Sequence, residues 1–439
     1  MRLAASAILA VALALPATAQ TLLRDAEMER ALREMARPVI AAAGLSPSQI
    51  RIIVLREEAP NAFIVDGRAV FLTSGLILKM ERPEMLQAVI AHEVAHIANG
   101  HITRRASNAR AARNMALLGI ALSAAVAAES PAAAAGVVAG TQSAAARNFF
   151  AHTRAEEIAA DQSGIRYLAR ANIDPSGMVD VLQLFRGQEA LSPRRQDAYV
   201  RTHPLSADRI RAVKGMVAAF READEPDPTA QYWFARSRAK LSAYLRNPSW
   251  TLRRIKQGDT SDAALVARTV AHSQAVNPAQ ALQAVDALIA KRPNDPYAHE
   301  LRGWVLFQAR RFDAAVASYA TASQIASSEP LILAGYGRAL LATDSNDARA
   351  LEVLQRARAR DPYNPALLRD LAQAQARLGQ RGAASLSTAE RYALAGRLKD
   401  AAIHAKRATD ILPRGSAGWQ RAQDIAVAAE TQAKRNRSR

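Results

Sequence analysis

The segment His92-Glu93-Val94-Ala95-His96 has the residue types and the spacing to hold a metal ion and to move a proton beside it. On a helix, residues four positions apart lie one turn apart on the same face, so the imidazoles of His92 and His96 could meet at one Zn²⁺. Glu93 lies next to that face, where its carboxylate could take a proton from a water molecule at the metal. The alternative is an accidental triplet in which two core histidines flank a solvated glutamate. The motif favours metal-assisted hydrolysis.

Two histidines leave a zinc site without its third protein ligand. Glu157 and Asp161 lie four residues apart in a second helical segment and would share one face of it. By themselves they are typical of an exposed acidic pair, but downstream of this motif Glu157 is the best candidate for the third ligand. Asp161, one turn further on, could hydrogen-bond a ligating imidazole and fix its tautomer.

A further histidine, His101, follows the motif. It does not complete the metzincin pattern, in which the third histidine would fall at the position of Ile102. On a continuous helix His101 would face away from His92. We therefore expect it to lie at the helix end, or to support a ligand from outside the ligand set.

Helices are expected around the motif. The motif helix should begin near Arg82, because Pro83 suits a first helical turn, and no helix-breaking residue follows before Gly100. The apolar and charged pattern of 22–43 predicts one or two amphipathic helices, and a short helix is expected over 75–80.

A small sheet is expected before the motif helix. The run 50–55 is rich in β-branched residues and predicts a buried strand. The apolar runs 62–65 and 69–72 flank Asp66-Gly67, which is the usual composition of a tight hairpin turn.

The start of the chain predicts export. Residues 1–19 have the basic end, the short apolar centre and the A-x-A site of a secretory signal peptide, so we expect cleavage after Ala19 and a periplasmic location. The chain has no cysteine, which excludes a lipid anchor on an N-terminal cysteine. The formal net charge of +18 would suit a polyanion, but export argues against nucleic acid as a partner and we expect none. Most of the excess is arginine scattered along Ala-rich segments, which favours a solvated surface.

Residues 115–140 are rich in alanine and are interrupted by Glu129-Ser130-Pro131. Each half is too short to cross a bilayer. The segment is expected to pack as a helix pair against the protein, and peripheral membrane contact through 115–140 is the alternative.

Three segments together resemble metallopeptidase family 48. They are the motif at 92–96, the later E-x-x-A-D at 157–161, and 61–76 before the motif. The family includes the CAAX prenyl protease, the membrane protease HtpX and periplasmic proteases with C-terminal tetratricopeptide (TPR) repeats. The resemblance covers roughly residues 22–215.

The resemblance implies a gluzincin-type zinc metalloprotease domain, with one Zn²⁺ per chain held by His92, His96 and Glu157. It also implies an edge strand that binds an extended substrate backbone by strand addition. The residues of that strand are Asn61, Ala62 and Phe63.

The segment Arg201-Thr202-His203-Pro204 looks like the T-H-P segment of the periplasmic members, in which the loop histidine approaches the zinc. By this resemblance His203 joins Glu93 as a candidate catalytic residue, and would either close the site or stabilise charge on the tetrahedral intermediate. The alternative is a loop histidine that hydrogen-bonds nearby backbone.

The second half of the chain has a repeating pattern. Pro293, Pro330 and Pro362 recur at intervals of 37 and 32 residues, close to the TPR period. Each follows a predicted helix of small residues, and stacked helical hairpins of this kind bury one continuous core. The interval from Pro362 to Pro413 is too long for one pair and requires an additional helix. An unrelated helical bundle is the alternative.

The predicted fold class is α+β and mostly α, with a small β-sheet in the protease domain and an α-solenoid of TPR-like helical hairpins after it. The predicted domains are a signal peptide (1–19), a zinc metalloprotease domain (20–222), a connecting helix (223–257), TPR-like repeats (258–415) and a C-terminal helix with a basic tail (416–439).

The leading functional hypothesis is a periplasmic zinc-dependent endopeptidase. By family resemblance it would hydrolyse misfolded or misassembled outer-membrane proteins, while its repeats dock to the outer-membrane assembly machinery. The alternative is a chaperone-like TPR adaptor whose zinc site is latent, structural or auto-inhibited, and His203 is the residue that could block it.

Overall fold

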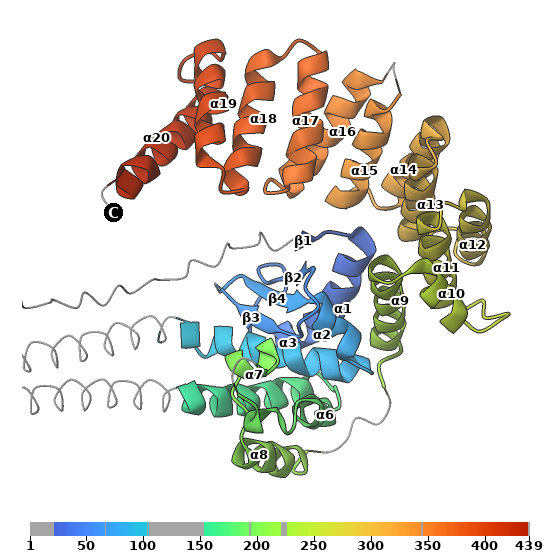
Figure 1. Ribbon diagram of the computed structural model, residues 1–439, viewed down its shortest axis with the longest axis vertical. Coiled ribbons are helices and arrows are strands. Elements are labelled where there is room, and N and C mark those ends of the chain that lie inside the picture. The colour runs from blue at the N-terminus through green and yellow to red at the C-terminus, as the bar shows by residue number, and fades with distance from the viewer. Residues whose placement is uncertain are drawn as a thin grey trace, which may run out of the picture. The chain divides into compact units, whose positions relative to one another are not determined.

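The computed structural model describes residues 22–65, 67–102, 104, 153–192, 195–220, 226–343 and 346–437 (Figure 1). The predicted signal peptide and the segment 115–140 lie outside the described residues. The chain divides into two compact units, one made of residues 1–23 and 32–231 and the other of residues 24–31 and 232–439. Helices dominate both units and the first contains a small sheet, which confirms the predicted α+β, mostly α, fold class.

The sheet of the first unit has the strand order β1-β2-β4-β3. Its strands are Leu22–Leu23 (β1), Arg51–Leu55 (β2), Ala62–Ile64 (β3) and Ala69–Thr73 (β4). β2 and β4 run parallel at the centre, and β1 and β3 pair antiparallel with them from the two sides. The predicted hairpin is therefore β3 with β4, and β3 lies at an edge of the sheet.

One boundary prediction was wrong. Leu22 and Leu23 were expected to open an amphipathic helix, but they form β1, because their backbones pair with Leu55 and Val54. Helix α1 begins only at Ala26. Pairing with a strand distant in the sequence overrides the local helical pattern here.

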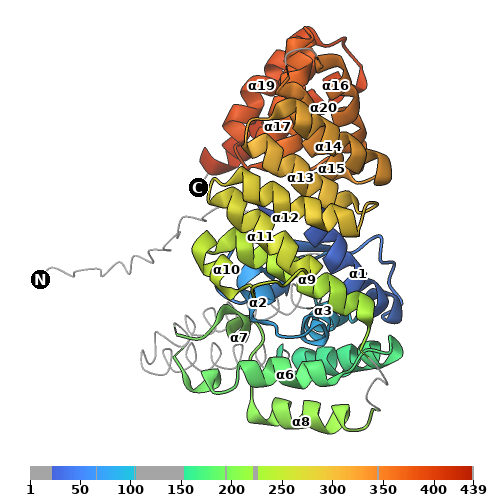
Figure 2. The same ribbon diagram turned by 90° about the vertical axis from the view of Figure 1, so that its right-hand side faces the viewer.

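The first unit also contains helices, of which α2 (Ser74–Lys79) and α3 (Pro83–Ala98) contact the sheet. The others are α1 (Ala26–Ala42, of which residues from Leu32 belong to this unit), α6 (Ser176–Leu184), α7 (Ala198–Thr202) and α8 (Ala207–Val217), with a 3₁₀ turn at Gln188–Ala190 and further helical residues at 153–170. α6 lies between α3 and α8 (Figure 2). Every residue of α3 from Pro83 to His96 is buried, so the motif helix is the core of the unit.

Two glycines allow other helices to approach α3 closely. A Cβ on Gly177 would lie 2.5 Å from the carbonyl oxygen of Glu84, so α6 can pack here only with glycine. Gly164, in the helical residues 153–170, lies against the backbone of Ala91 and His92, where a Cβ would be 3.4 Å from the nearest α3 atoms. This packing brings the acidic segment next to the motif.

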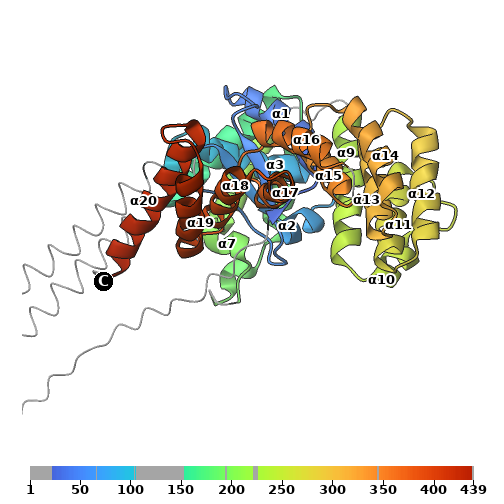
Figure 3. The ribbon, with the colours of Figure 1, turned by 90° about the horizontal axis from the view of Figure 1, so that it is seen from above.

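The second unit is a succession of helices that follow one another in a curved row (Figures 1 and 3). They are α9 (Pro228–Leu245, of which residues from Tyr232 belong to this unit), α10 (Pro248–Arg254), α11 (Asp262–Gln274), α12 (Pro278–Lys291), α13 (Pro296–Gln308), α14 (Phe312–Ile325), α15 (Pro330–Leu341), α16 (Asp347–Arg360), α17 (Pro365–Arg377), α18 (Arg381–Leu394), α19 (Leu398–Ile411) and α20 (Ala417–Arg437). Each helix from α11 to α20 packs on its neighbours in sequence, the arrangement of TPR-like hairpins.

Glycines in the repeats allow neighbouring helices to pack closely. A Cβ on Gly303 would lie 2.7 Å from the ring of Tyr319, and one on Gly335 would lie 2.5 Å from the same ring. The α13, α14 and α15 helices therefore pack around one buried aromatic side chain. Between Pro362 and Pro413 the structure has α17, α18 and α19, so the long interval contains the expected additional helix.

The segment 223–257, predicted as one connecting helix, contains two, α9 and α10. The break falls at Asn247-Pro248, where the Asn247 side chain accepts a hydrogen bond from the Ser249 amide and so caps a new helix. Among the residues that the structure describes, no helix combines the length and the apolar character needed to cross a membrane.

Candidate metal centre

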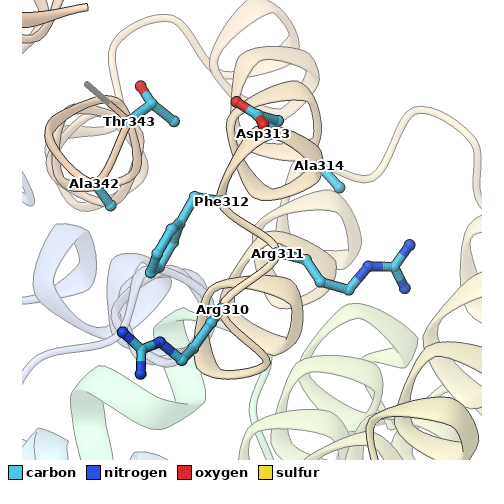
Figure 4. Close-up of a pocket in the computed structure, with 7 residues that line it drawn as sticks. All are labelled: Arg310, Arg311, Phe312, Asp313, Ala314, Ala342 and Thr343. Atoms are coloured by element: carbon cyan, nitrogen blue, oxygen red, sulfur yellow. The ribbon is translucent and has the colours of Figure 1, made fainter. Parts of the chain in front are cut away.

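The side chains that could ligate a metal gather in the first unit. Within the described residues, one group has donor atoms that all lie within 4.8 Å of one another: His92, His96, Glu157 and His203. By contrast, a cavity of about 520 Å³ in the second unit, between the α13–α14 turn and the end of α15, has two basic side chains that point in different directions, Arg310 and Arg311 (Figure 4). These do not converge on one ligand, so the four-residue cluster is the better site.

α3 supplies the two motif histidines and Glu93. All three side chains are buried, and the Nε2 atoms of His92 and His96 face each other at 3.1 Å. The predicted one-turn spacing therefore directs both rings at one point. Two unprotonated ring nitrogens would repel each other at this distance, and a cation between them removes the conflict.

The helical residues 153–170 supply the two acidic side chains. Glu157 lies 3.2 Å from His92 Nε2 and 3.3 Å from His96 Nε2. Asp161 accepts a hydrogen bond from His92 Nδ1 at 2.9 Å. Glu157 is therefore among the donor atoms, and Asp161 holds His92 from behind.

His203 follows α7 and enters the cluster from a third segment. Its Nδ1 lies 3.0 Å from Glu157 Oε2 and 3.1 Å from His92 Nε2. Its Nε2 donates to the carbonyl oxygen of Ala62 at 3.1 Å. The loop histidine is thus part of the donor set, and it also makes the backbone contact that was the alternative for it.

The donor set fits a zinc ion. Four ligands placed about 2.0–2.1 Å from a tetrahedral centre lie about 3.3–3.4 Å from one another. The nearest donor distances here are 3.0 to 3.3 Å. Three imidazole nitrogens and one carboxylate are also the ligand types that zinc prefers.

Glu93 lies beside the cluster without joining it. Its Oε1 is buried and accepts no hydrogen bond from any residue that the structure describes. The atom lies 3.2 Å from His203 Nε2, whose hydrogen bond is directed at Ala62. A buried carboxylate oxygen with free acceptor capacity next to a metal-ligand set is what a general base requires.

Arg209 is the functional side chain that sequence reasoning missed. Its guanidinium is buried and forms a bidentate contact with Asp161, at 2.6 Å from Nε and 2.9 Å from Nη2. Its Nη1 lies 3.2 Å from Glu157 Oε2 and donates to the carbonyl oxygen of Pro204 at 3.2 Å. Two buried carboxylates require a cation nearby, so the sequence indicated that some lysine or arginine must accompany Glu157 and Asp161. It did not indicate which of the 58 lysines and arginines has this role.

Burial and the neighbouring charges shift the pKa values of the cluster. Burial would lower the pKa of His92, but its hydrogen bonds with Asp161 and Glu157 outweigh burial and raise the pKa to about 9. For His96 burial prevails over the contact with Glu157 and lowers the pKa to about 3. Burial would raise the pKa of Asp161, but the charge of Arg209 reverses this and lowers it to about 2. The low pKa of Asp161 keeps its carboxylate charged and the low pKa of His96 keeps its imidazole unprotonated, as cation binding requires, whereas the raised pKa of His92 means that a cation must displace a proton from this side chain.

His101 does not face away from the motif. Its Nδ1 lies 2.8 Å from His96 Nδ1, and the side chain is buried. The expectation of an outward-facing ring assumed a continuous helix, but α3 ends at Ala98 and Gly100 adopts a φ of +68°. The reversal of the chain turns His101 back towards the site.

The predicted substrate strand lies beside His203. Asn61 directly precedes β3, and its side-chain oxygen accepts a hydrogen bond from Thr202 Oγ1 at 3.0 Å. Ala62 is buried, and Phe63 stacks on Phe71 with ring centroids 5.2 Å apart. The edge strand and the donor set are therefore joined through the 202–203 segment.

Residues 23–217 match the family model described as Peptidase family M48. The first unit carries a peptidase domain of family M48. This confirms the family suggested by the motif, and with it the assignment of the chain as a metallopeptidase. The donor cluster within this unit consists of the three predicted ligands, His92, His96 and Glu157, together with His203, which was predicted as a catalytic residue.

Individual relatives extend the comparison. A beta-barrel assembly-enhancing protease of Yersinia pestis is 25% identical over 388 residues, which are 87% of this chain and 79% of that protein. The mitochondrial metalloendopeptidase OMA1 of Schizosaccharomyces pombe is 28% identical over 179 residues, 40% of this chain and 49% of that protein. Among solved structures, yeast Tom70 covers 82% of both chains at 14% identity, but a TM-score of 0.30 does not establish a common fold.

Proposed function

We propose that the M48 domain is a zinc endopeptidase of the periplasm that cleaves unfolded or misassembled outer-membrane proteins, and that the repeats of the second unit dock to the machinery that assembles them. The name of the Yersinia pestis relative supports the substrate class, and the predicted signal peptide at 1–19 supports the location. We also propose that the protease domain extends over 20–222 and the repeats over 258–415.

One observation carries the proposal: the donor atoms of four buried side chains lie within 4.8 Å of one another, beside a buried glutamate oxygen that accepts no hydrogen bond from the described residues. His92, His96 and Glu157 would hold the ion, which when bound acts as a Lewis acid that polarises the scissile carbonyl. Glu93 takes the proton of the attacking water at Oε1 and returns it to the leaving amine. Asp161 and Arg209 keep His92 and Glu157 in place.

The edge strand is proposed to bind the substrate backbone. β3 pairs with β4 on one side only, and its other side runs past the donor set at Ala62. An extended segment of an unfolded barrel protein could add to this edge by main-chain hydrogen bonds, with little demand on its sequence. Such binding suits an enzyme that recognises the unpaired strands of a misassembled barrel.

A second candidate function is a chaperone-like adaptor whose zinc site is autoinhibited. The observation that favours it is His203, whose Nδ1 lies within the donor set and whose Nε2 holds Ala62. A ligand at that position would compete with substrate for both the ion and the strand. We propose that this arrangement is the closed form of the peptidase, in which His203 must move before cleavage.

The decisive experiment uses Glu93→Gln in the full chain. Zinc-loaded wild type should cleave an unfolded outer-membrane barrel protein and should stop when a chelator is added. Glu93→Gln should retain the zinc, measured by elemental analysis, and should lose cleavage by at least about 100-fold, because the proton acceptor is gone. Glu84→Gln, on the same buried helix but outside the cluster, is the matched control and should cleave normally.

Two results would separate the candidates. Full cleavage by Glu93→Gln would refute Glu93 as the base. If wild type binds zinc, cleaves nothing, and still prevents aggregation of the barrel protein as well as Glu93→Gln does, the adaptor is the better description.

A further inference from the structure

Each imidazole of the cluster has a second nitrogen that points away from the donor set, and the three partners of these nitrogens differ. His92 Nδ1 contacts the carboxylate of Asp161 at 2.9 Å, and His203 Nε2 contacts the carbonyl of Ala62 at 3.1 Å. A carboxylate and a backbone carbonyl are the usual partners of ligating histidines. The partner of His96 is another imidazole, that of His101, and nothing in the proposed mechanism uses it.

The contact between His96 and His101 is short and buried. The two Nδ1 atoms lie 2.8 Å apart, the ring centroids are 4.8 Å apart, and the ring planes meet at 73°. His101 is 2% exposed. At this distance the two nitrogens must share one proton, because two lone pairs or two N–H groups would repel each other.

The direction of this hydrogen bond follows from His96. Its Nε2 faces the donor set, 3.3 Å from Glu157 Oε1 and 3.1 Å from His92 Nε2. A ligating nitrogen carries no proton, so the single proton of a neutral imidazole lies on the other nitrogen, Nδ1. His96 therefore donates, and His101 Nδ1 accepts.

The backbone holds His101 in position. The amide of Asn99 closes the end of α3, and Gly100 then turns through a φ of +68°, a conformation that favours glycine. The Asn99 side chain donates to Ser163 Oγ at 3.2 Å and so ties the turn to the helical residues that carry Glu157. On an uninterrupted helix, position 101 would lie about 140° around the axis from His96 and could not reach it.

We propose that His101 is a positioning residue of the metal site, which accepts the Nδ1 proton of His96 and thereby fixes the tautomer and the ring orientation that direct Nε2 at the ion. This inference rests on the proposed zinc site. An imidazole orients the ligand without adding another buried negative charge to a site that already holds the carboxylates of Glu157 and Asp161 next to the guanidinium of Arg209.

The test compares three forms of the full chain: wild type, His101→Phe and His101→Asn. Phenylalanine fills the ring volume but cannot accept, whereas the asparagine amide can place an oxygen near the position of Nδ1. Zinc affinity is measured by competition with a chromophoric chelator. His101→Phe should bind zinc about 10-fold to 100-fold more weakly than wild type. His101→Asn should recover most of that loss.

A second measurement observes the protonation of the ring nitrogens directly in the wild-type protein. In zinc-loaded protein labelled with ¹⁵N-histidine, the Nδ1 of His101 should have the shift of an unprotonated nitrogen, and the Nδ1 proton of His96 should be protected from exchange. The chain has 8 histidines, and the signals of His101 are identified by their disappearance in His101→Asn, whereas the His96 Nδ1 proton is identified by its change in shift in that variant.

The outcomes separate the inference from the proposed function. If wild type binds no zinc, the proposed function itself fails. If wild type binds zinc and His101→Phe binds it equally well, or if His101→Asn and His101→Phe are equally impaired, the hydrogen bond has no positioning role and the zinc site stands without it. A protonated Nδ1 on His101 in the zinc-loaded protein would also overturn the inference.

Discussion

The Nε2 atom of His203 donates a hydrogen bond to the carbonyl oxygen of Ala62, 3.1 Å away. This carbonyl belongs to the open side of the edge strand. The preceding carbonyl, that of Asn61, accepts from the Thr73 amide and so points towards β4, and carbonyls alternate in direction along a strand. One side chain therefore occupies a donor position of the metal cluster and an acceptor that an added substrate strand would use.

His203→Ala should increase cleavage of an unfolded barrel protein. Removal of the imidazole frees a donor position and the Ala62 carbonyl together, so the substrate no longer has to displace a ligand. We expect a rate several-fold higher at low substrate concentration, and zinc affinity that is lower by about tenfold because one nitrogen donor is lost. The measurement is the initial rate of cleavage with zinc in excess.

His299→Ala is the matched control for this prediction, because His299 in the second unit also donates from Nε2 to a backbone carbonyl, that of Pro293 at 2.9 Å. That variant should cleave at the wild-type rate. Loss of cleavage in zinc-saturated His203→Ala would instead assign His203 to stabilisation of the tetrahedral intermediate.

Arg209→Met should destabilise the M48 domain strongly. The substitution keeps much of the side-chain volume but leaves Asp161 and Glu157 buried without their cation, and loss of one partner from a buried charge cluster costs about 3–5 kcal/mol. Urea unfolding in the presence of a chelator measures this free energy without the contribution of zinc.

Arg211→Met tests whether the effect is specific to the cluster. Arg211 lies on the same helix, α8, but its side chain is 71% exposed and pairs with Asp208 at the surface. We expect a change in the free energy of unfolding below about 0.5 kcal/mol. Similar losses in the two variants would mean that Arg209 stabilises the helix and not the buried carboxylates.

The sequence was sufficient for the parts of the fold that depend on local patterns. The run 50–55, the turn at Asp66-Gly67 and the proline-punctuated helices predicted β2, the β3–β4 hairpin and the repeats. The strand β1 could not be predicted, because two leucines become a strand only through pairing with Val54 and Leu55. The break between α9 and α10 depends on a single cap at Asn247 inside an otherwise helical pattern.

The same division applies to the site. The spacing of His92 and His96 is a property of one helix, and the structure brings Glu157 to them across the Gly164 contact. Arg209 could not be selected, since its role arises from two carboxylates that approach it only in the folded unit. The direction of the His101 ring was predicted wrongly because a continuous helix was assumed, although Gly100 was the signal that the helix ends before it. The expected place of His101, at the helix end and next to a ligand, agrees with its contact with His96.

Zinc binding should release a proton at about pH 7.5. Burial would lower the pKa of His92, but Asp161 and Glu157 raise it to about 9, so a metal ion must displace a proton that His92 holds at this pH. Zinc affinity should therefore rise with pH by about tenfold per unit up to about pH 9. Calorimetry in buffers of different ionisation enthalpy measures the proton, and Asp161→Asn should reduce the release. An affinity that stays constant from about pH 7 to pH 9 would contradict the assignment.

Gly100→Ala and Gly44→Ala should have the same effect on folding and different effects on metal binding. Both glycines end a helix of the first unit, with φ of +68° and +75°, and a Cβ at either position would meet no atom within 4 Å. The free energy of unfolding should therefore fall only by the cost of a left-handed backbone at alanine, about 1–2 kcal/mol in each case.

Only Gly100 sets the position of His101 behind His96. Relaxation of the strained turn should therefore weaken zinc binding by about tenfold in Gly100→Ala and leave it unchanged in Gly44→Ala. Urea unfolding and chelator competition measure the two quantities on the same samples, and equal zinc affinities in variants that are equally destabilised would show that the turn does not support the metal site.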